Sequence, residues 1–277
     1  MIVRRIAAFS DGLTGGNPAG VVICTTLPTA FEMQQIAAEV GFSETAFCEP
    51  IAERWRVRYF SPETEVPFCG HATIALGAAL AMDHGDGVFG LTLNAAEITV
   101  EGQRSGETFA AALQSPPSQS RPAASELVAS ALALLGYADS DLDLALPPAI
   151  AEAGATHLVI ALKSRQRLAA MAYDLDAGRR LMKDAGLITI SLVHVESARL
   201  FNARNPFASG GVYEDPATGA AAAAFAGYLR DLEWPHGGEI EIVQGEDMGM
   251  RSRLRAAIST TAGGSIRVSG TARVMRS

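Results

Sequence analysis

The chain has little lysine and no long apolar run. Lys163 and Lys183 are its two lysines, and 30 acidic residues against 22 basic ones give a formal net charge of -8. Binding to nucleic-acid phosphates normally requires a basic surface patch, so this balance argues against a nucleic-acid partner. No segment approaches the ~18 consecutive apolar residues of a membrane helix, and no hydrophobic signal region follows Arg4 and Arg5. We therefore expect a cytoplasmic protein without a membrane partner.

Cysteine and histidine are also too sparse for a structural metal site or a disulfide framework. Cys24, Cys48 and Cys69 are widely spaced, which predicts reduced thiols. The chain has no dinucleotide-binding glycine fingerprint, no Walker phosphate loop, no nucleophile elbow and no His-Glu-x-x-His motif. Four of the five histidines stand alone in the sequence: His84, His157, His194 and His236. The sequence therefore predicts neither a metal nor a cofactor.

The composition is that of a globular protein large enough for two domains. Hydrophobic residues make up 48% of the 277 residues and charged residues 19%. The clearest break is the Pro/Ser-rich stretch 113–122, which is typical of a linker. We predict an N-terminal lobe over residues 1–115 and a C-terminal lobe over residues 116–277, with room for the last residues to cross back to the first lobe.

Several elements have marked ends. Thr29 and Glu32 form a capping-box pattern before an apolar stripe that includes Phe31, and Gly41 closes the helix. A second helix is predicted over 125–135. Residues 54–60 alternate arginine with apolar side chains, which indicates a strand with one polar face.

Two loops each lead into a helix of small residues. Cys69-Gly-His-Ala-Thr opens a predicted helix over 72–82, and Pro216-Ala-Thr-Gly-Ala opens another over 220–229. The two segments are weakly similar, as expected for a duplicated unit. Small side chains allow strands to approach a helix closely, so the sequence predicts two open sheets, each around a central helix.

The starts of these helices are candidate binding sites. The first amides of a helix have no intrahelical acceptor and carry partial positive charge, so Gly70-His71-Ala72 and Gly219-Ala220 are suited to hold a carboxylate. The alternative is that the glycines only permit tight turns.

Four side chains are candidates for chemistry. Glu44, a lone carboxylate in the predicted apolar strand 43–47, suits a general acid/base, although most strand glutamates face solvent. His71 would orient a substrate or relay a proton, or cap its helix. Asp215 would bind an amine or hydroxyl, or act as an ordinary cap. Cys69 would be a thiolate base, but the matching turn at 215–219 has no cysteine.

Four motifs in this order resemble the PhzF-like family of phenazine-biosynthesis proteins. They are Asn17-Pro-Ala-Gly-Val-Val, Ser43-Glu-Thr-Ala-Phe, Glu65-Val-Pro-Phe-Cys-Gly-His-Ala-Thr and Glu214-Asp-Pro-Ala-Thr-Gly, and Gln244-Gly matches as well. The resemblance covers nearly the whole chain. It implies a diaminopimelate-epimerase-like α+β fold: two similar lobes, each a curved, mostly antiparallel sheet around a central helix, usually assembled as a homodimer.

The resemblance also implies an isomerase that needs no cofactor. Glu44 matches the family's proton-transferring glutamate, and His71 and Asp215 match active-site positions. Asn17, Gly70, Ala72, Gly219 and Ala220 complete the expected substrate-binding set. Ala220 departs from the family pattern, which has a serine there, so a hydroxyl donor is lost.

From these observations we expect an enzyme that moves a proton within a small carboxylated substrate. Two alternatives remain open: an amino-acid racemase or epimerase that uses Cys69, and a binding protein without turnover.

Overall fold

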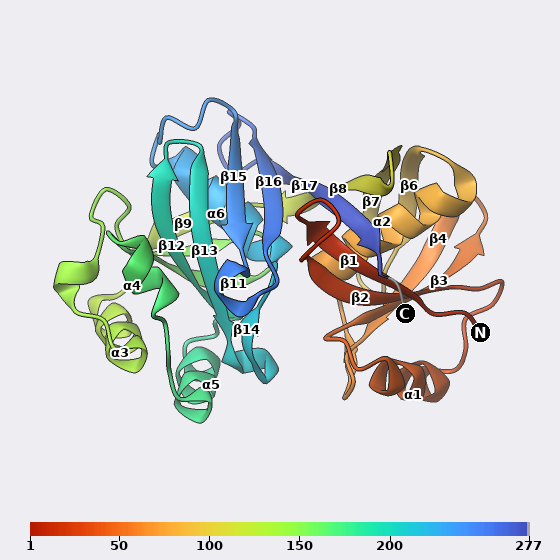
Figure 1. Ribbon diagram of the computed structural model, residues 1–277, viewed down its shortest axis with the longest axis horizontal. Coiled ribbons are helices and arrows are strands. Elements are labelled where there is room, and N and C mark those ends of the chain that lie inside the picture. The colour runs from red at the N-terminus through yellow and green to blue at the C-terminus, as the bar shows by residue number, and fades with distance from the viewer. Residues whose placement is uncertain (276–277) are drawn as a thin grey trace. The chain divides into compact units, whose positions relative to one another are not determined.

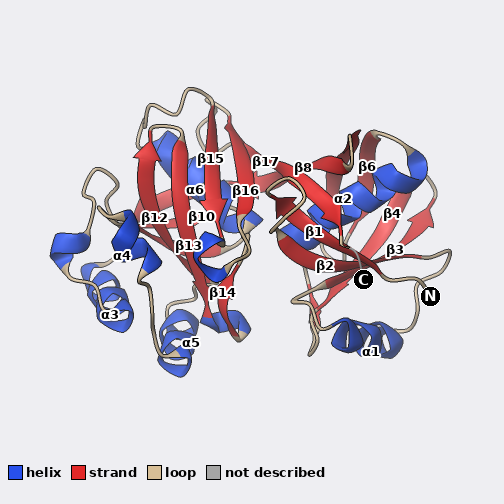
Figure 2. Cartoon of the chain, viewed as in Figure 1, coloured by secondary structure: helices blue, strands red, loops and turns tan. Residues whose placement is uncertain are grey.

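The computed structural model describes residues 1–275, which fall into two compact units. Unit 1 consists of residues 1–114 together with 269–275, and unit 2 consists of residues 115–268. Strands β8 (Thr108–Pro117) and β17 (Ser265–Val274) each contain residues of both units. Each unit combines strands with helices, and within each unit one helix lies against the strands: α2 in unit 1 and α6 in unit 2 (Figures 1 and 2).

The strands of the two units follow one pairing plan. The relevant strands of unit 1 are β1 (Arg4–Ser10), β2 (Asn17–Ile23), β3 (Thr45–Ile51), β4 (Arg54–Phe60), β5 (Glu65–Val66), β6 (Gly87–Thr92) and β7 (Glu97–Ser105). Those of unit 2 are β10 (Ala149–Glu152), β11 (Thr156–Ala161), β12 (Thr189–Ser197), β13 (Leu200–Phe207), β14 (Val212–Asp215), β15 (Glu239–Gln244) and β16 (Ser252–Ile258).

Taken in chain order, these strands pair in the same sense. β1–β2 and β10–β11 are antiparallel, β2–β3 and β11–β12 are parallel, and β3–β4 and β12–β13 are antiparallel. β4–β5 and β13–β14 are antiparallel, and β4–β6 and β13–β15 are parallel. β6–β7 and β15–β16 are antiparallel. Both units are therefore mostly antiparallel versions of one α+β plan, as the sequence predicts.

The central helix of unit 1, α2 (Gly70–His84), is buried over most of its length. Its small residues permit direct contact with a strand backbone. A Cβ atom added to Gly102 of β7 would lie 2.2 Å from the carbonyl oxygen of Gly77, and one added to Gly77 would lie 2.6 Å from Val100. Any larger residue at either glycine would push α2 off the strand, which explains the small-residue pattern seen in the sequence.

The central helix of unit 2, α6 (Gly219–Asp231), is likewise buried along most of its length. Outer helices cover a second face of the strands in this unit: α3 (Ser125–Leu135) and α5 (Leu175–Asp184) pack on one apolar cluster with β11 and β12. The remaining helices of unit 2 are the short α4 (Arg165–Ala169) and the 3-10 turns η1 (Asp139–Asp141), η2 (Ala208–Gly210) and η3 (Glu246–Met248). No helix in the described part of the chain is long and apolar enough to cross a membrane.

Helix α1 (Ala30–Val40) has the predicted ends and one unpredicted surface residue. Thr29 and Glu32 form the capping box, and Gly41 adopts the left-handed conformation with φ 70°. Met33 and Ala37 are buried, but Phe31 is 70% exposed. Phe31 lies two positions from Met33 and therefore points to the opposite side of the helix, so its assignment to the buried stripe was wrong.

The Pro/Ser-rich stretch at 113–122 contains the boundary between the two units, after residue 114, but it forms strands instead of an irregular linker. β8 continues to Pro117, and β9 (Gln119–Pro122) pairs with β10. The serines bond to neighbouring backbone: the Ile266 N–H donates to the Ser115 hydroxyl, and the Ser118 hydroxyl donates to the Gly264 carbonyl. Long-range pairing therefore overrides a composition typical of a loop.

A buried histidine makes the stability of unit 2 depend on pH. His157 of β11 is fully buried, and its Nδ1 lies 2.8 Å from the Thr189 hydroxyl. Burial lowers the pKa of His157 to about 4. Below pH ~6.5 the unfolded chain binds a proton at this residue that the folded chain does not, so the free energy of unfolding falls as the pH drops from ~6.5 to ~4.

We predict that His157→Gln reduces this pH dependence. Between pH 7 and pH 5 the variant should lose about 2 kcal/mol less than the unmodified chain, measured by urea unfolding at each pH. His84→Gln, at an exposed histidine, serves as the control and should lose as much as the unmodified chain. An unchanged slope in His157→Gln would contradict the assignment.

Candidate active site

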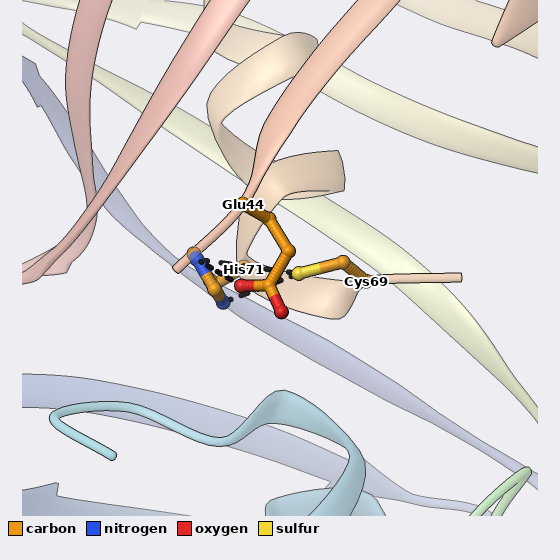
Figure 3. Close-up of side chains that lie close together, drawn as sticks. All are labelled: Glu44, Cys69 and His71. Carbon is orange, nitrogen blue, oxygen red and sulfur yellow. Dashed lines mark hydrogen bonds and ion pairs between the residues drawn. The ribbon is translucent and has the colours of Figure 1, made fainter. Parts of the chain in front are cut away.

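Three side chains of unit 1 converge at the start of α2 (Figure 3). The Nε2 atom of His71 lies 3.4 Å from the Glu44 carboxylate, and its Nδ1 atom lies 3.3 Å from the Cys69 sulfur. Ser43 adds a hydroxyl 3.4 Å from Nε2. The side chains of Glu44 and His71 are 14% and 7% exposed, so their contact is largely shielded from water.

The local fold brings these residues together from separate segments. Glu44 immediately precedes β3 instead of lying within a strand, which corrects the prediction for residues 43–47. Its carbonyl accepts a hydrogen bond of 3.1 Å from the Gly20 N–H of the neighbouring strand β2. Cys69 is the N-cap residue of α2, and His71 lies in the first turn. The carboxylate is thus held just before strand β3, and the thiol and imidazole are held at the start of the buried helix α2.

The two nitrogens of His71 link the other two groups. A neutral imidazole has one donor and one acceptor nitrogen. If Nε2 carries the proton, it donates to Glu44 while Nδ1 accepts from the Cys69 thiol; this tautomer is assigned from the network. A proton can then pass along one chain of hydrogen bonds between the thiol and the carboxylate.

Glutamate, cysteine and histidine are also zinc ligands, and one ligand atom from each lies within 4.8 Å of the others. Their arrangement favours proton transfer over metal binding. The Cys69 sulfur lies nearer to Nδ1 of His71, at 3.3 Å, than to Nε2, at 4.0 Å, whereas the Glu44 carboxylate lies near Nε2; one metal ion would bind only one of the two ring nitrogens. The N-terminus of α2 also carries partial positive charge, which opposes a cation.

Neither central helix is capped by the side chain of its own N-cap residue. No side-chain capping bond is made at Cys69 of α2 or at Thr218 of α6 within the described chain. His71 is therefore not the cap of its helix. The first amides of α2, at Gly70, His71 and Ala72, lack intrahelical acceptors and suit a ligand carboxylate.

The corresponding turn of unit 2 holds a second polar cluster. Asp215 ends β14, and its Oδ2 accepts a bond of 2.5 Å from the Thr218 hydroxyl. Gln244, which ends β15, bonds to both residues. Gly219 and Ala220 open α6. Asn17, the remaining predicted binding residue, is buried at the start of β2 of unit 1, opposite Ala8 of β1.

Each turn is preceded by an arginine–glutamate pair that sequence reasoning missed. Arg58 Nε and Nη2 donate to the two oxygens of Glu65 at 2.8 and 2.5 Å, and Arg204 does the same to Glu214 at 2.9 and 2.5 Å. Glu65 and Glu214 each stand five residues before the glycine that opens the helix. Extending the comparison of the two small-residue helices upstream would have revealed this shared Glu-x-Pro-x-x-Gly pattern.

Comparison with known proteins identifies the family. The model of the family described as phenazine biosynthesis-like protein matches residues 6–277. An uncharacterized isomerase, YddE, of Escherichia coli K12 is 30% identical over 249 residues, covering 88% of this chain and 84% of the relative. An uncharacterized isomerase of Mesorhizobium japonicum is 30% identical over 277 residues, covering 92% and 89%. The chain belongs to the phenazine biosynthesis-like protein family.

Solved structures share the fold. A predicted epimerase from Pseudomonas aeruginosa superimposes with a TM-score of 0.86 at 22% identity, covering 99% of this chain and 96% of the other. A hydroxyproline epimerase from Agrobacterium vitis, solved with bound trans-4-hydroxy-L-proline, has a TM-score of 0.61 at 10% identity and covers 99% and 88%. The fold is thus the one that the sequence resemblance implies.

We predict that the two arginine–glutamate pairs differ in their contribution to stability. The side chains of Arg204 and Glu214 are 8% and 3% exposed, against 22% and 27% for Arg58 and Glu65. Removing one partner of a buried pair leaves an uncompensated charge, so Glu214→Gln should lower the free energy of unfolding by about 3 kcal/mol. Chemical denaturation of the variant measures the loss.

Glu65→Gln is the matched control, because it removes the same contact at the more exposed pair. It should cost about 1 kcal/mol or less. Equal losses in the two variants would show that burial does not set the strength of these pairs.

Proposed function

We propose that the protein is an isomerase that moves a proton within a small carboxylated substrate, with Glu44 as the general acid/base and no cofactor. The observation that carries this proposal is the convergence of Glu44, His71 and Cys69 at the uncapped start of α2. The family relatives named as isomerases support the reaction class.

The geometry suggests a role for each group in unit 1. The first amides of α2 bind a carboxylate of the substrate, which brings the neighbouring carbon close to the acid/base groups. Glu44 removes a proton and returns it elsewhere. His71 holds the Glu44 carboxylate by its Nε2 atom, so the acceptor oxygen is positioned before the substrate binds.

In unit 2, we assign Asp215, Gly219 and Ala220 to the binding of polar groups of a ligand. Ala220 has no hydroxyl to donate, so the phenazine-forming reaction in the family's name is not carried over to this chain. Asn17 completes the proposed binding set in unit 1. We also propose that the protein acts in the cytoplasm as a homodimer and binds no nucleic acid.

One specific observation favours a second reaction. The Cys69 sulfur lies 3.3 Å from Nδ1 of His71, so the imidazole is placed to take the thiol proton. A Cys69 thiolate and Glu44 would then exchange an α-proton of an amino acid, as a racemase or epimerase requires. The equivalent position of unit 2 is Thr218, so the thiol has no counterpart there.

Proton exchange in heavy water tests the proposal. The unmodified chain is incubated with a panel of small cyclic and amino carboxylates, and deuterium incorporation is followed by NMR. Glu44→Gln should lower the exchange rate by at least ~100-fold, because the acid/base group is lost while its shape is kept. Glu39→Gln, at an exposed glutamate of α1, is the control and should exchange at the original rate.

The outcomes distinguish the isomerase, the racemase or epimerase, and the binding protein without turnover. A Glu44→Gln variant that retains full exchange would refute the role of Glu44. Loss of exchange in Cys69→Ser as well as in Glu44→Gln would favour the racemase, because that reaction uses both groups as bases. Compounds that bind without exchanging any proton would favour a binding protein without turnover.

A further inference from the structure

Both the oxygen and the nitrogen of the Gln244 side-chain amide bond to the turn that opens α6 in unit 2. Its side chain is 1% exposed. The Thr218 N–H donates to its Oε1 at 3.2 Å, and its Nε2 lies 2.6 Å from the Asp215 carbonyl and 3.1 Å from the Thr218 hydroxyl. Three bonds therefore tie the end of β15 to the turn that opens α6.

The chemistry of the partners determines the direction of every bond. A backbone N–H can only donate and a backbone carbonyl can only accept, so Oε1 must face Thr218 N and Nε2 must face Asp215 O. Nε2 then donates to the Thr218 hydroxyl as well. The hydroxyl proton is left for the Asp215 Oδ2, at the 2.5 Å typical of a hydroxyl bound to a carboxylate. Gln244 thus makes the Thr218 hydroxyl a donor to Asp215 Oδ2.

The residues around Gln244 hold its backbone at the turn. Gly245 has φ +74°, and a Cβ atom there would lie 2.7 Å from the Pro216 carbonyl and 2.5 Å from that of Met250. Charged groups on the neighbouring elements are already paired: Glu214 with Arg204, and Glu246 and Asp247 of η3 with Arg165. The backbone after the end of β15 therefore packs directly against Pro216 of the turn and against Met250.

Unit 1 has the same arrangement of strands and turn, but no side-chain amide at the position equivalent to Gln244. The parallel pairing aligns Asn202 with Val243 in unit 2 and Arg56 with Thr92 in unit 1. Arg56 and Asn202 each stand two residues before the arginine of the glutamate pair. Leu93, which follows Thr92, therefore occupies the position equivalent to Gln244. An apolar side chain suffices for the fold at this place, so the amide serves the turn of unit 2.

We propose that Gln244 is the positioning residue for Asp215: it fixes the Thr218 hydroxyl as a donor to the Asp215 carboxylate and caps the turn that opens α6. The proposal rests on the proposed function only in taking Asp215 as a ligand-binding residue. Its test needs no substrate, so its failure is distinct from failure of the proposed reaction.

The test follows the Asp215 carboxyl by ¹³C NMR across pH in the full chain, assigned by loss of its signal in Asp215→Asn. Gln244→Leu places the residue of unit 1 at the equivalent position. It should raise the titration midpoint of Asp215 by about one pH unit, since the hydroxyl is no longer directed at the carboxylate. Amide hydrogen exchange at Thr218 should accelerate at least ~10-fold, because the amide loses its acceptor.

Three further variants distinguish positioning from general loosening. Thr218→Val removes the hydroxyl and should raise the midpoint by itself, whereas Thr218→Ser keeps the hydroxyl and should not. The double variant Gln244→Leu with Thr218→Val should shift the midpoint no further than Thr218→Val alone, because both changes break the same chain of bonds.

Gln244→Glu keeps an acceptor for the Thr218 amide but, once ionised, has no proton to donate. It should leave Thr218 exchange slow, and it serves also if Gln244→Leu fails to fold. Because the added carboxylate also repels Asp215, a rise of the Asp215 midpoint supports the proposal only if adding Thr218→Val to this variant raises the midpoint no further. The proposal is overturned if Gln244→Leu and Gln244→Glu both titrate at Asp215 as the unmodified chain does. It is overturned equally if the shifts of Gln244→Leu and Thr218→Val are additive.

Discussion

The direct contact between the backbone of α2 and strand β7 is the constraint on which the candidate active site depends. Gly77 and Gly102 meet without side chains between them, so α2 packs directly against the backbone of β7. Burial of its length leaves the N-terminus at a defined place, where Cys69 and His71 meet Glu44 from the start of β3. A longer side chain at either glycine would displace α2 and so move Cys69 and His71 away from Glu44, because a packed interior cannot absorb the extra volume.

The same scaffold carries different side chains in the two units. Both place a two-bond arginine–glutamate pair before a proline-containing turn, and both open a buried helix with glycine. The side chains that follow differ: unit 1 has Cys69 and His71 where unit 2 has Thr218 and Ala220. A duplicated unit permits the support to repeat while other positions diverge, since the pairs and glycines maintain the turn and the side chains of the first helical turn are free to change.

Local signals in the sequence were reliable where the interaction itself is local. The capping box of α1, the limits of α3 and the alternation of β4 were predicted correctly because each depends on residues within a few positions of one another. The strands within 113–122 were missed because the prolines and serines of this stretch indicate a loop, while its hydrogen-bond partners lie far along the chain at Gly264 and Ile266. Phe31 was misplaced because composition alone does not say which face of a helix meets the sheet.

The sequence by itself determined the family, the two similar α+β lobes and the identity of Glu44, His71 and Asp215 as candidates, since these follow from motifs and spacing that are continuous in the chain. Only the tertiary structure decided which groups meet. It showed that Nδ1 of His71 faces Cys69 while Nε2 faces Glu44, and that Gln244 sets the direction of the bonds at Thr218 and Asp215. Hydrogen-bond direction and contact between distant segments depend on side-chain orientation in the packed fold, which no spacing along a single chain specifies.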